Sequence, residues 1–399
     1  MAINLSNRVK AIPPSPTLTI SNKAKEMMAQ GIDVVNFGVG EPDFNTPDYI
    51  KESAKKAIDD NFTRYTANAG IPELRKAICE KFKKDNGLEY SPEQILVSPG
   101  AKASIVFALL ATINPGDKVL VPAPYWVSYP SQVELAGGQC VYVETLESNN
   151  FKITAEQIED CVKKEGVIKA FFLNSPNNPT GAVYNKEELT KIAAVCVKHN
   201  IMVISDEIYE KLIYDGETHI SIATISPEIK DLTIIINGVS KVYAMTGWRL
   251  GYLAAPLNIA KSAGRVQEHA SSNTNSITQK AAVAALTQDD GSIEKMRLEF
   301  AKRKDFLIDA LNKIENVTCI VPHGAFYAVP NISYYIKNNT KGFTTSSEIS
   351  LYLLENYHIA CVAGDSFGLN DIIRFSYANS MENLVKGVER FEKGLKSLI

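Results

Sequence analysis

Five apolar runs without polar alternation constrain the fold of this 399-residue chain more than any other feature. They are rich in β-branched and aromatic residues, and nearly every run leads into a turn that holds a polar residue or a glycine. Strands that are apolar on both sides suit a parallel sheet that helices cover on both faces. The runs are Ile95-Leu96-Val97, Val119-Leu120-Val121, Ala170-Phe171-Phe172-Leu173, Met202-Val203-Ile204 and Thr233-Ile234-Ile235-Ile236.

The chain is long enough for about two domains, because one core ordinarily serves roughly 100–200 residues. From about residue 95 to 285 the apolar runs alternate with helical stretches, which is typical of an α/β domain with a mostly parallel sheet. Beyond residue 292, a long charged helical stretch leads to short strand-like runs and further helices, as in a smaller α+β domain. We therefore expect a large domain over residues 46–287 and a small domain over 288–399. Residues 1–45 should form an N-terminal arm and part of the small domain.

The N-terminal stretch is expected to be extended, because Pro13, Pro14 and Pro16 exclude a helix interior there. It carries no apolar segment of signal-peptide length. No window of the chain approaches the roughly 18 apolar residues of a membrane span. We expect no association with a membrane.

Composition argues against several classes of function. The net charge of −3 gives no electrostatic basis for binding nucleic acid or an acidic membrane surface. The six cysteines contain no CxxC pair and should be reduced and mostly buried, as in a cytosolic protein. The five histidines show no ligand spacing, so we expect no metal site. The expected location is the cytoplasm.

The segment Gly238–Gly251 follows the last apolar run and places Lys241 in a turn of small residues that includes Ser240. Arg249 comes eight residues after the lysine, between a tryptophan and a Leu-Gly pair. A lysine amine attacks a carbonyl readily only when burial or a neighbouring cation depresses its pKa, and an arginine can hold a phosphate with two hydrogen bonds. A Schiff-base lysine beside a phosphate anchor is what pyridoxal phosphate requires. The alternative is a plain turn with a solvated lysine.

Polar residues after other runs fit the same cofactor, because ligands bind at the carboxyl ends of the strands in such sheets. Asp206 could pair with the ring nitrogen and keep it protonated, and Tyr209 could hydrogen-bond the phenolic oxygen of the ring. Asn178, in the loop Asn174–Gly181, could donate to that oxygen as well. Taken singly, Asp206 also fits a helix N-cap, and the asparagine loop also fits an ordinary turn.

Further candidates follow the remaining runs. Gly100 and Ala101 begin a helical stretch whose first amides can bind a phosphate, although the chain has no Walker loop there. Trp126 could stack on the cofactor ring, but a tryptophan in this place is as often part of a core. Arg374 lies in the strand-like run Ile372–Ser376, where an unpaired charge is costly. It either grips a substrate carboxylate with two hydrogen bonds or forms an inter-domain ion pair.

Together these motifs resemble the class-I (fold type I) pyridoxal-phosphate aminotransferases over essentially the whole chain, and are closest to the bacterial type-Ib aspartate aminotransferases. The segments phrased as in that subgroup are Tyr125–Pro130, Ala244–Arg249 and Gly324–Tyr327. The resemblance implies that Lys241 holds pyridoxal 5'-phosphate and transfers protons, with Asp206 and Tyr209 as its catalytic partners. The implied cofactor-binding residues are Gly100, Ala101, Lys102, Trp126, Asn178, Asp206, Tyr209, Ser240, Lys241, Arg249 and, reaching into the neighbouring subunit, Tyr65.

The resemblance also implies the substrate site and the reaction. Arg374 would grip the substrate α-carboxylate near the backbone of Gly40, and Lys102 would bind the distal carboxylate of aspartate or glutamate. Lys102 could instead be a solvated lysine of a first helical turn, and Tyr65 an ordinary surface tyrosine. The implied reaction is a ping-pong transfer of an amino group between L-aspartate, or a related amino acid, and 2-oxoglutarate in a homodimer. The implied substrate-binding residues are Gly40, Lys102, Trp126, Asn178 and Arg374.

Alternative functions on the same fold remain open. Relatives of the type-Ib group act on prephenate, aromatic amino acids or kynurenine, and a carbon–sulfur lyase uses the same cofactor. A cofactor-binding regulator would need a DNA-binding extension, for which only about 30 residues precede the Gly38 region. An NAD-dependent oxidoreductase is disfavoured, because Gly38-Val39-Gly40-Glu41-Pro42 lacks the third glycine of the dinucleotide fingerprint.

Overall fold

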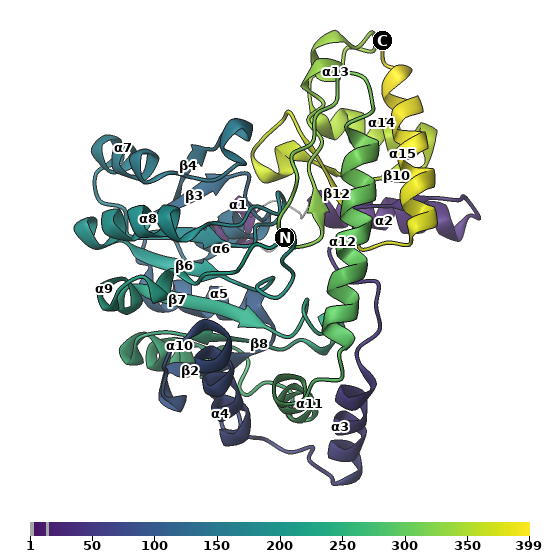
Figure 1. Ribbon diagram of the computed structural model, residues 1–399. Helices are drawn as coiled ribbons and strands as arrows, with labels where there is room; N and C mark the ends of the chain where they lie inside the picture. The colour runs from purple at the N-terminus through teal and green to yellow at the C-terminus, as the bar shows by residue number, and fades with distance from the viewer. Residues whose placement is uncertain (1–3, 13–15) are drawn as a thin grey trace.

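The computed structural model describes residues 4–12 and 16–399 and has a seven-stranded sheet in its larger part (Figure 1). Strand β8 runs antiparallel to both of its neighbours, and all other neighbouring strands are parallel. In spatial order the strands are β2 (Ile95–Ser98), β8 (Gly251–Ala254), β7 (Thr233–Gly238), β6 (Met202–Asp206), β5 (Ala170–Asn174), β3 (Lys118–Ala123) and β4 (Gln139–Glu144). The five apolar runs are β2, β3, β5, β6 and β7, so the predicted α/β class is confirmed.

Helices cover both faces of this sheet, as the doubly apolar strands require. Phe171 and Phe172 of β5 point to opposite faces and belong to different cores. One face carries α5 (Ala101–Thr112), α6 (Ser128–Leu135) and α10 (Leu257–Ala270). The other carries α7 (Ala155–Glu165), α8 (Lys186–His199) and α9 (Pro227–Asp231), and near β2 and β8 also α3 (Asp48–Asp59), α4 (Pro72–Lys81) and α11 (Ser276–Thr287).

Local sequence signals set where several of these helices begin. Thr154 and Gln157 form a capping box at the start of α7, and Asn185 and Glu188 form another at the start of α8. In each box two backbone amides that lack a helical partner receive a side-chain acceptor. The helices therefore start at defined residues close to the sheet.

The C-terminal part has its own small antiparallel sheet in the order β11-β12-β9 and its own core. Its strands are β9 (Tyr327–Ala328), β11 (Val362–Ala363) and β12 (Ile373–Ser376), and its helices are α12 (Ser292–Leu311), α13 (Ser333–Asn338), α14 (Ser346–Tyr357) and α15 (Met381–Lys396). Strand β1 (Val35–Asn36) pairs with β10 (Ile359–Ala360), so a segment before residue 46 joins this part. The boundaries expected between the two domains stay a prediction.

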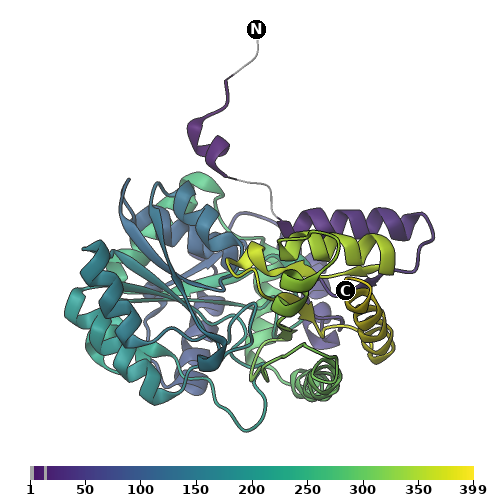
Figure 2. The same ribbon diagram turned by 90° about the horizontal axis from the view of Figure 1, so that it is seen from above.

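The N-terminal segment differs from the expected extended arm, because α1 (Asn7–Ala11) and α2 (Pro16–Ala29) are helical. Pro16 opens α2, a position where its missing N–H would have no helical acceptor. Pro13 and Pro14 lie outside the described residues. Helix α2 lies alongside α14 (Figure 2), with Ala24 buried in a small core that it shares with residues of the C-terminal part.

Aromatic packing joins the two parts behind the carboxyl ends of the central strands. Tyr209, in the loop after β6, lies 5.4 Å from Phe326 and 5.8 Å from Tyr327, measured between ring centroids, and both contacts are edge-on.

Among the described residues, no helix is both long and apolar enough to cross a membrane.

Gly251 of β8 packs closely against the start of α5, and this close contact leads to the first prediction. A Cβ at Gly251 would lie 2.6 Å from Ala101 Cα and closer still to the Ala101 amide nitrogen. We therefore expect Gly251→Ala to lower the free energy of unfolding by about 1–3 kcal/mol, as overpacking of a close contact typically does. Urea denaturation measures this. Gly264→Ala is the matched control: its Cβ would meet Leu96 at an ordinary 3.8 Å, so it should be neutral or stabilising. Equal effects of the two substitutions would contradict the prediction.

Candidate active site

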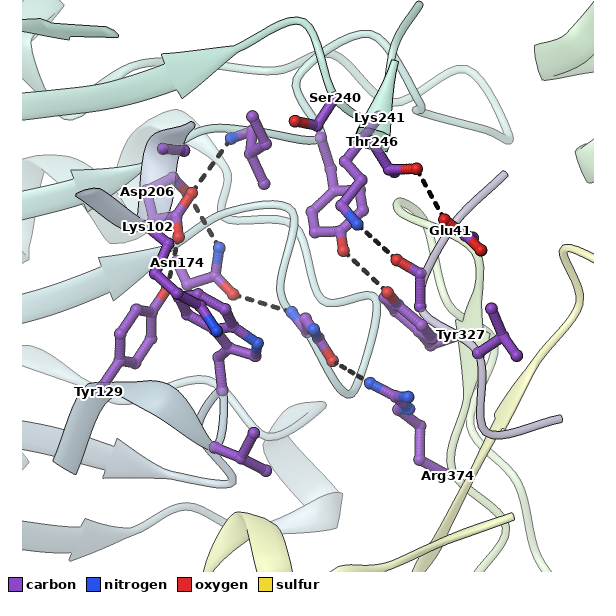
Figure 3. Close-up of a pocket in the computed structure, with 18 of the residues that line it drawn as sticks. Glu41, Lys102, Tyr129, Asn174, Asp206, Ser240, Lys241, Thr246, Tyr327 and Arg374 are labelled. Carbon is purple, nitrogen blue, oxygen red and sulfur yellow. Dashed lines mark hydrogen bonds between the residues drawn. The ribbon is translucent and has the colours of Figure 1, made fainter. Parts of the chain in front are cut away.

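The carboxyl ends of the central strands surround a cavity of about 400 Å³ (Figure 3). Asn174 ends β5, Asp206 ends β6, and Lys241 follows the end of β7. Arg374 comes from β12 in the other part of the protein. The cavity therefore lies where the two parts meet. The residues predicted from sequence that line it are Gly40, Ala101, Lys102, Trp126, Asn178, Asp206, Tyr209, Ser240, Lys241, Arg249 and Arg374.

The Lys241 amine sits in a setting that favours its neutral form. Its Nζ donates a hydrogen bond to the backbone oxygen of Gly40. Burial lowers the pKa of Lys241 to about 8; the negative charge of Glu41 opposes this shift, and the cations Arg374 and Arg249 add to it. A neutral amine is consequently accessible near physiological pH, which is what a nucleophilic lysine needs.

Asp206 is a buried carboxylate whose hydrogen-bond partners are neutral. Its Oδ2 accepts from the Tyr129 hydroxyl at 2.7 Å, and its Oδ1 accepts a longer bond from the Ile208 amide at 3.3 Å. Burial raises the pKa of Asp206 to about 6, although the bond from Tyr129 counteracts the shift. Because Asp206 lines the cavity, a cationic ligand group placed there can pair with its buried carboxylate.

Gly100 and Arg249 form a cradle suited to a phosphate. Gly100 has a φ of +90°, and a Cβ there would lie 2.5 Å from Nη2 of Arg249, so only glycine lets the guanidinium come this close. The first amides of α5 follow directly at Ala101, and they have no acceptor within the helix. Ser240 adds a hydroxyl to the same cavity. Gly100 itself does not line the cavity, but its lack of a side chain leaves room for Arg249, which does.

Arg374 is buried without a carboxylate partner among the described residues. Its Nη1 donates to Oδ1 of Asn178 and its Nη2 to the oxygen of Gly38, both at 2.9 Å, and its Nε has no acceptor. Its guanidinium also lies 4.4 Å from the ring centroid of Tyr327. The inter-domain ion pair considered from sequence is therefore wrong. A buried cation held by neutral groups suits an anionic ligand.

The remaining predicted residues differ in how they are placed. Asn178 uses its oxygen for Arg374, which leaves its amide nitrogen as a donor, while the hydroxyl of Tyr209 lies 2.8 Å from that of Tyr327. The ammonium of Lys102 lies 4.9 Å from the ring centroid of Trp126. Much of the Lys102 side chain is accessible, yet partial desolvation in the cavity lowers its pKa, and Arg249 adds to this.

Tyr65 does not line the cavity and is 91% exposed in the single chain. The role expected for it toward a neighbouring subunit therefore cannot be performed within one chain.

Comparisons with known proteins agree with this geometry. The family model described as "Aminotransferase class I and II" matches residues 32–391. The chain is 45% identical to the aspartate aminotransferase of Geobacillus stearothermophilus, over 99% of this chain and 100% of the relative. It is 42% identical to the probable aspartate/prephenate aminotransferase of Aquifex aeolicus over the full length of both chains.

Solved structures show the same likeness. The aspartate aminotransferase of Rhizobium meliloti superposes with a TM-score of 0.95 at 37% identity, covering all of both chains. That of Thermus thermophilus, solved with maleate, has a TM-score of 0.92 at 39% identity and covers 98% of this chain and all of its own. This chain belongs to the class I and II aminotransferases.

The predicted family and fold type I architecture are thereby confirmed, and the cofactor of this aminotransferase is pyridoxal phosphate. The residues of the cavity fit that group. The cradle of Gly100 and Arg249 suits its phosphate, the buried Asp206 suits a protonated ring nitrogen, and Lys241 suits its aldehyde.

Sequence reasoning missed several residues that complete the site of this aminotransferase. Tyr129, Asn174 and Tyr327 line the cavity, yet no role was predicted for them. Asn174 Nδ2 donates to the backbone oxygen of Asp206 at 2.9 Å and its Oδ1 accepts from the Asn178 amide at 2.8 Å, so it holds two site residues in place. The spacing of Trp126 and Tyr129 was a usable signal, because residues three apart share one side of a helical turn.

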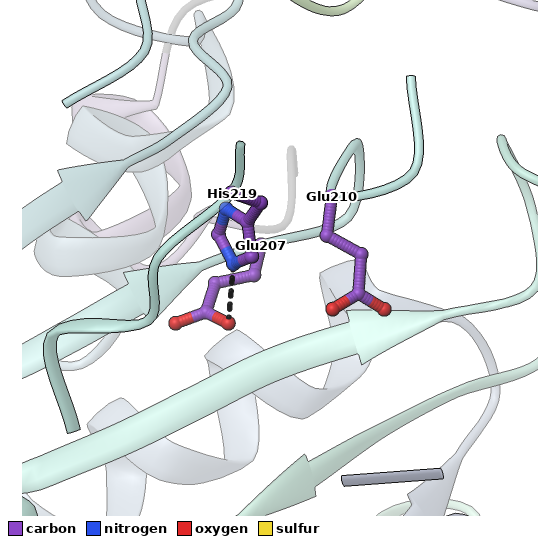
Figure 4. Close-up of side chains that lie close together, drawn as sticks. All are labelled: Glu207, Glu210 and His219. Carbon is purple, nitrogen blue, oxygen red and sulfur yellow. Dashed lines mark hydrogen bonds and ion pairs between the residues drawn. The ribbon is translucent and has the colours of Figure 1, made fainter. Parts of the chain in front are cut away.

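Three further polar side chains lie together outside the cavity, although no metal site was expected. Ligand atoms of Glu207, Glu210 and His219 lie within 4.8 Å of one another (Figure 4). They already have partners in the protein. Glu207 accepts from Ser205 at 2.8 Å, Ser221 at 2.6 Å and His219 at 2.9 Å, and Glu210 pairs with the buried Lys81. The cluster anchors the chain on either side of Tyr209, and the absence of a metal stays a prediction.

The lowered pKa of Lys241 leads to the second prediction. A group whose pKa is about 8 exposes its neutral amine as the pH rises through 8, about two units before an ordinary lysine does. In the apoenzyme, acylation of Lys241 followed by peptide mass spectrometry should therefore be half-maximal near pH 8.

The exposed Lys191 is the internal control, because Glu187 raises its pKa above 10.5 and it should react only at higher pH. Identical pH profiles for the two lysines would contradict the assignment. Lys241→Ala should abolish nearly all amino transfer, because it removes the amine that we expect to hold the cofactor and to transfer protons.

Proposed function

We propose that this aminotransferase moves the amino group of L-aspartate to 2-oxoglutarate by a ping-pong mechanism. The observation that carries the proposal is that one cavity presents two separated cations, Arg374 and Lys102, besides the nucleophilic Lys241 and the phosphate cradle. Two cations suit an amino acid with two carboxylates. The names of the relatives support the same substrate, and maleate, found in the Thermus thermophilus structure, is a four-carbon dicarboxylate.

In this proposal each part of the cofactor has its own protein groups. Its phosphate would be held by Arg249, Ser240 and the first amides of α5 from Ala101 onward, with Gly100 beside Arg249 and Lys102 nearby. Bound pyridoxal phosphate supplies a carbonyl for the amino group and an electron-poor ring that stabilises negative charge at the substrate α-carbon. Asp206 keeps the ring nitrogen protonated, and Trp126 covers the ring face.

The chain's own groups then orient the substrate and move protons. Arg374 receives the α-carboxylate beside the backbone of Gly40, and Lys102 receives the distal carboxylate. The neutral Nζ of Lys241 would accept the proton from the substrate α-carbon and, once protonated, would give it to the cofactor carbon on the other side of the transferred nitrogen. Asn178 and Tyr209 donate to the phenolic oxygen of the cofactor, which stabilises its deprotonated form. The second half-reaction, with 2-oxoglutarate, uses the same groups in reverse.

The test of this function is a panel of amino donors with 2-oxoglutarate as acceptor. Aspartate should give the highest kcat/KM, with glutamate formed in equal amount. The panel includes phenylalanine and kynurenine as donors, glutamate with prephenate as acceptor, and cysteine with pyruvate detection. Prephenate transamination as the main activity would favour the function for which the Aquifex aeolicus relative is named. Pyruvate release without amino transfer would favour a carbon–sulfur lyase.

The role of Lys102 gives the third prediction. Lys102→Met keeps the apolar stem over Trp126 but removes the charge, so kcat/KM for aspartate should fall about 10- to 100-fold. Phenylalanine, which lacks a distal carboxylate, should lose less than about threefold. Lys191→Met, outside the cavity, is the control for loss of a surface charge. Equal losses for both donors would contradict a role of Lys102 in binding the distal carboxylate, and no loss for either would leave it a solvated lysine.

We further propose a homodimer in which Tyr65 of each chain reaches the phosphate cradle of its neighbour. The support is the exposure of Tyr65 in the single chain together with the motif resemblance. Light scattering should give about twice the chain mass of 43.8 kDa. Tyr65→Phe should weaken cofactor binding without changing that mass, and an active monomer would refute the shared site.

Two further assignments complete the proposal. The domain division at residues 46–287 and 288–399 is supported by the separate sheets and cores of the two parts. A cytoplasmic location is supported by six free cysteines, most of them buried.

A further inference from the structure

Tyr129 is a buried tyrosine that contacts two residues proposed to act on the cofactor. It lies in the first turn of α6, and its hydroxyl donates to Oδ2 of Asp206 at 2.7 Å. Its ring meets that of Trp126 edge-on at 5.3 Å between centroids. On the other side it stacks on Phe172 of β5, at 4.2 Å and 15° between the ring planes. Packing of the ring therefore holds Tyr129 in place independently of the hydrogen bond that its hydroxyl makes.

We propose that Tyr129 is a positioning residue that keeps the Asp206 carboxylate ionised and oriented toward the cofactor ring nitrogen, while its ring sets the plane of Trp126. The proposal rests on the cofactor roles assigned above to Asp206 and Trp126. It adds that one side chain controls both the partner of the ring nitrogen and the aromatic cover of the ring.

The geometry of Asp206 makes Tyr129 its principal stabilising partner. The Ile208 amide is 3.3 Å away, which is a weak bond, and the Asn174 amide contacts the backbone oxygen of Asp206 rather than its carboxylate. Since an ionised buried carboxylate depends on its hydrogen bonds, the bond from Tyr129 matters more than it would at the surface.

The hydroxyl of Tyr129 is held in the donating role. Burial and the adjacent Asp206 raise the pKa of Tyr129 well above its usual value, so the hydroxyl keeps its proton over the working pH range. The other ionisable groups that act on Asp206 are Glu207, which raises its pKa, and Lys241, which lowers it; Tyr209 also lies close. None of these donates a hydrogen bond to the carboxylate.

Removing the hydroxyl should shift the titration of Asp206 in a known direction. A donor to the ionised form lowers a carboxyl pKa, so its loss raises that pKa above the wild-type value of about 6. Only the ionised carboxylate pairs with a cationic ring nitrogen. Cofactor affinity should therefore fall as the pH drops through about 6 in the wild type, and at a higher pH in Tyr129→Phe.

The test measures binding of pyridoxamine 5'-phosphate to the apoenzyme from pH 5.5 to 9, followed by tryptophan fluorescence. This amino form of the cofactor cannot react with Lys241, so the ionisation of that lysine does not enter as covalent capture. Tyr129→Phe should move the midpoint of the affinity loss up by about one pH unit, so that at pH 7 it binds about twofold more weakly than at pH 9 and at pH 6 roughly tenfold more weakly. Inorganic phosphate, titrated in parallel, reports the contribution of the phosphate's own ionisation.

Tyr184→Phe is the matched control, because it removes another buried tyrosine hydroxyl, which accepts from the Ile153 amide at 3.0 Å outside the cavity. It should leave the midpoint unchanged even if it lowers the thermal unfolding temperature as much as Tyr129→Phe does. A second comparison uses Asp206→Asn, which removes the titrating group. In that background Tyr129→Phe should have no effect on the pH dependence.

The outcomes separate this proposal from the proposed function. A uniform loss of affinity at every pH, with an unchanged midpoint, would overturn the positioning role and leave Tyr129 as a packing residue. A shifted midpoint in a protein that transfers no amino group would uphold the role of Tyr129 while rejecting the reaction. If Tyr129→Phe does not fold, an Asp206→Asn variant that retains the wild-type pH dependence would overturn the proposal.

Discussion

Burial of charged groups at the carboxyl edge of the central sheet is the constraint on which the rest of this structure depends. Asp206 and Arg374 are both almost fully buried, and neither has an oppositely charged hydrogen-bond partner among the described residues. A buried charge without a counter-ion costs several kcal/mol unless dipoles and hydrogen bonds surround it. The surroundings are accordingly specialised: a tyrosine hydroxyl supports the carboxylate, and an amide and a carbonyl support the guanidinium. A ligand that neutralises these charges offsets part of this burial cost, which adds to its binding free energy.

The same edge explains why much of the site could be predicted from sequence. In a parallel sheet the carboxyl ends of the strands converge, so residues that follow apolar runs come together whatever lies between the runs. Asp206, Lys241 and Asn178 were found in this way without any knowledge of contacts. Strand β8 was harder to anticipate, since it has only four residues and pairs antiparallel with β2, which lies far from it in the sequence, as well as with β7.

Other features could not be predicted, because they depend on contacts between distant segments. The partners of Arg374 are Asn178 and Gly38, and neither stands in a recognisable spacing to residue 374. The helical state of Pro16–Ala29 was missed, because a proline disfavours a helix interior but suits a first turn, and only the position of the helix start distinguishes the two. The spacing of Trp126 and Tyr129 could mark these two residues as neighbours, but the hydrogen bond from Tyr129 to Asp206 joins residues 77 positions apart and leaves no local signal.

The hydrogen bonds of Arg374 have a consequence for how the protein acquires its site. They tie residues 38, 178 and 374 together, so one side chain closes loops that span most of the 399-residue chain. Such contacts form late, after the segments between them have become ordered. All seven strands of the large sheet lie before residue 255, so a chain that ends before residue 374 can contain every one of them and still lack the carboxylate-binding position proposed for Arg374. In this proposal substrate binding reports on completed folding, since it requires the first and last tenths of the chain to be in place at once.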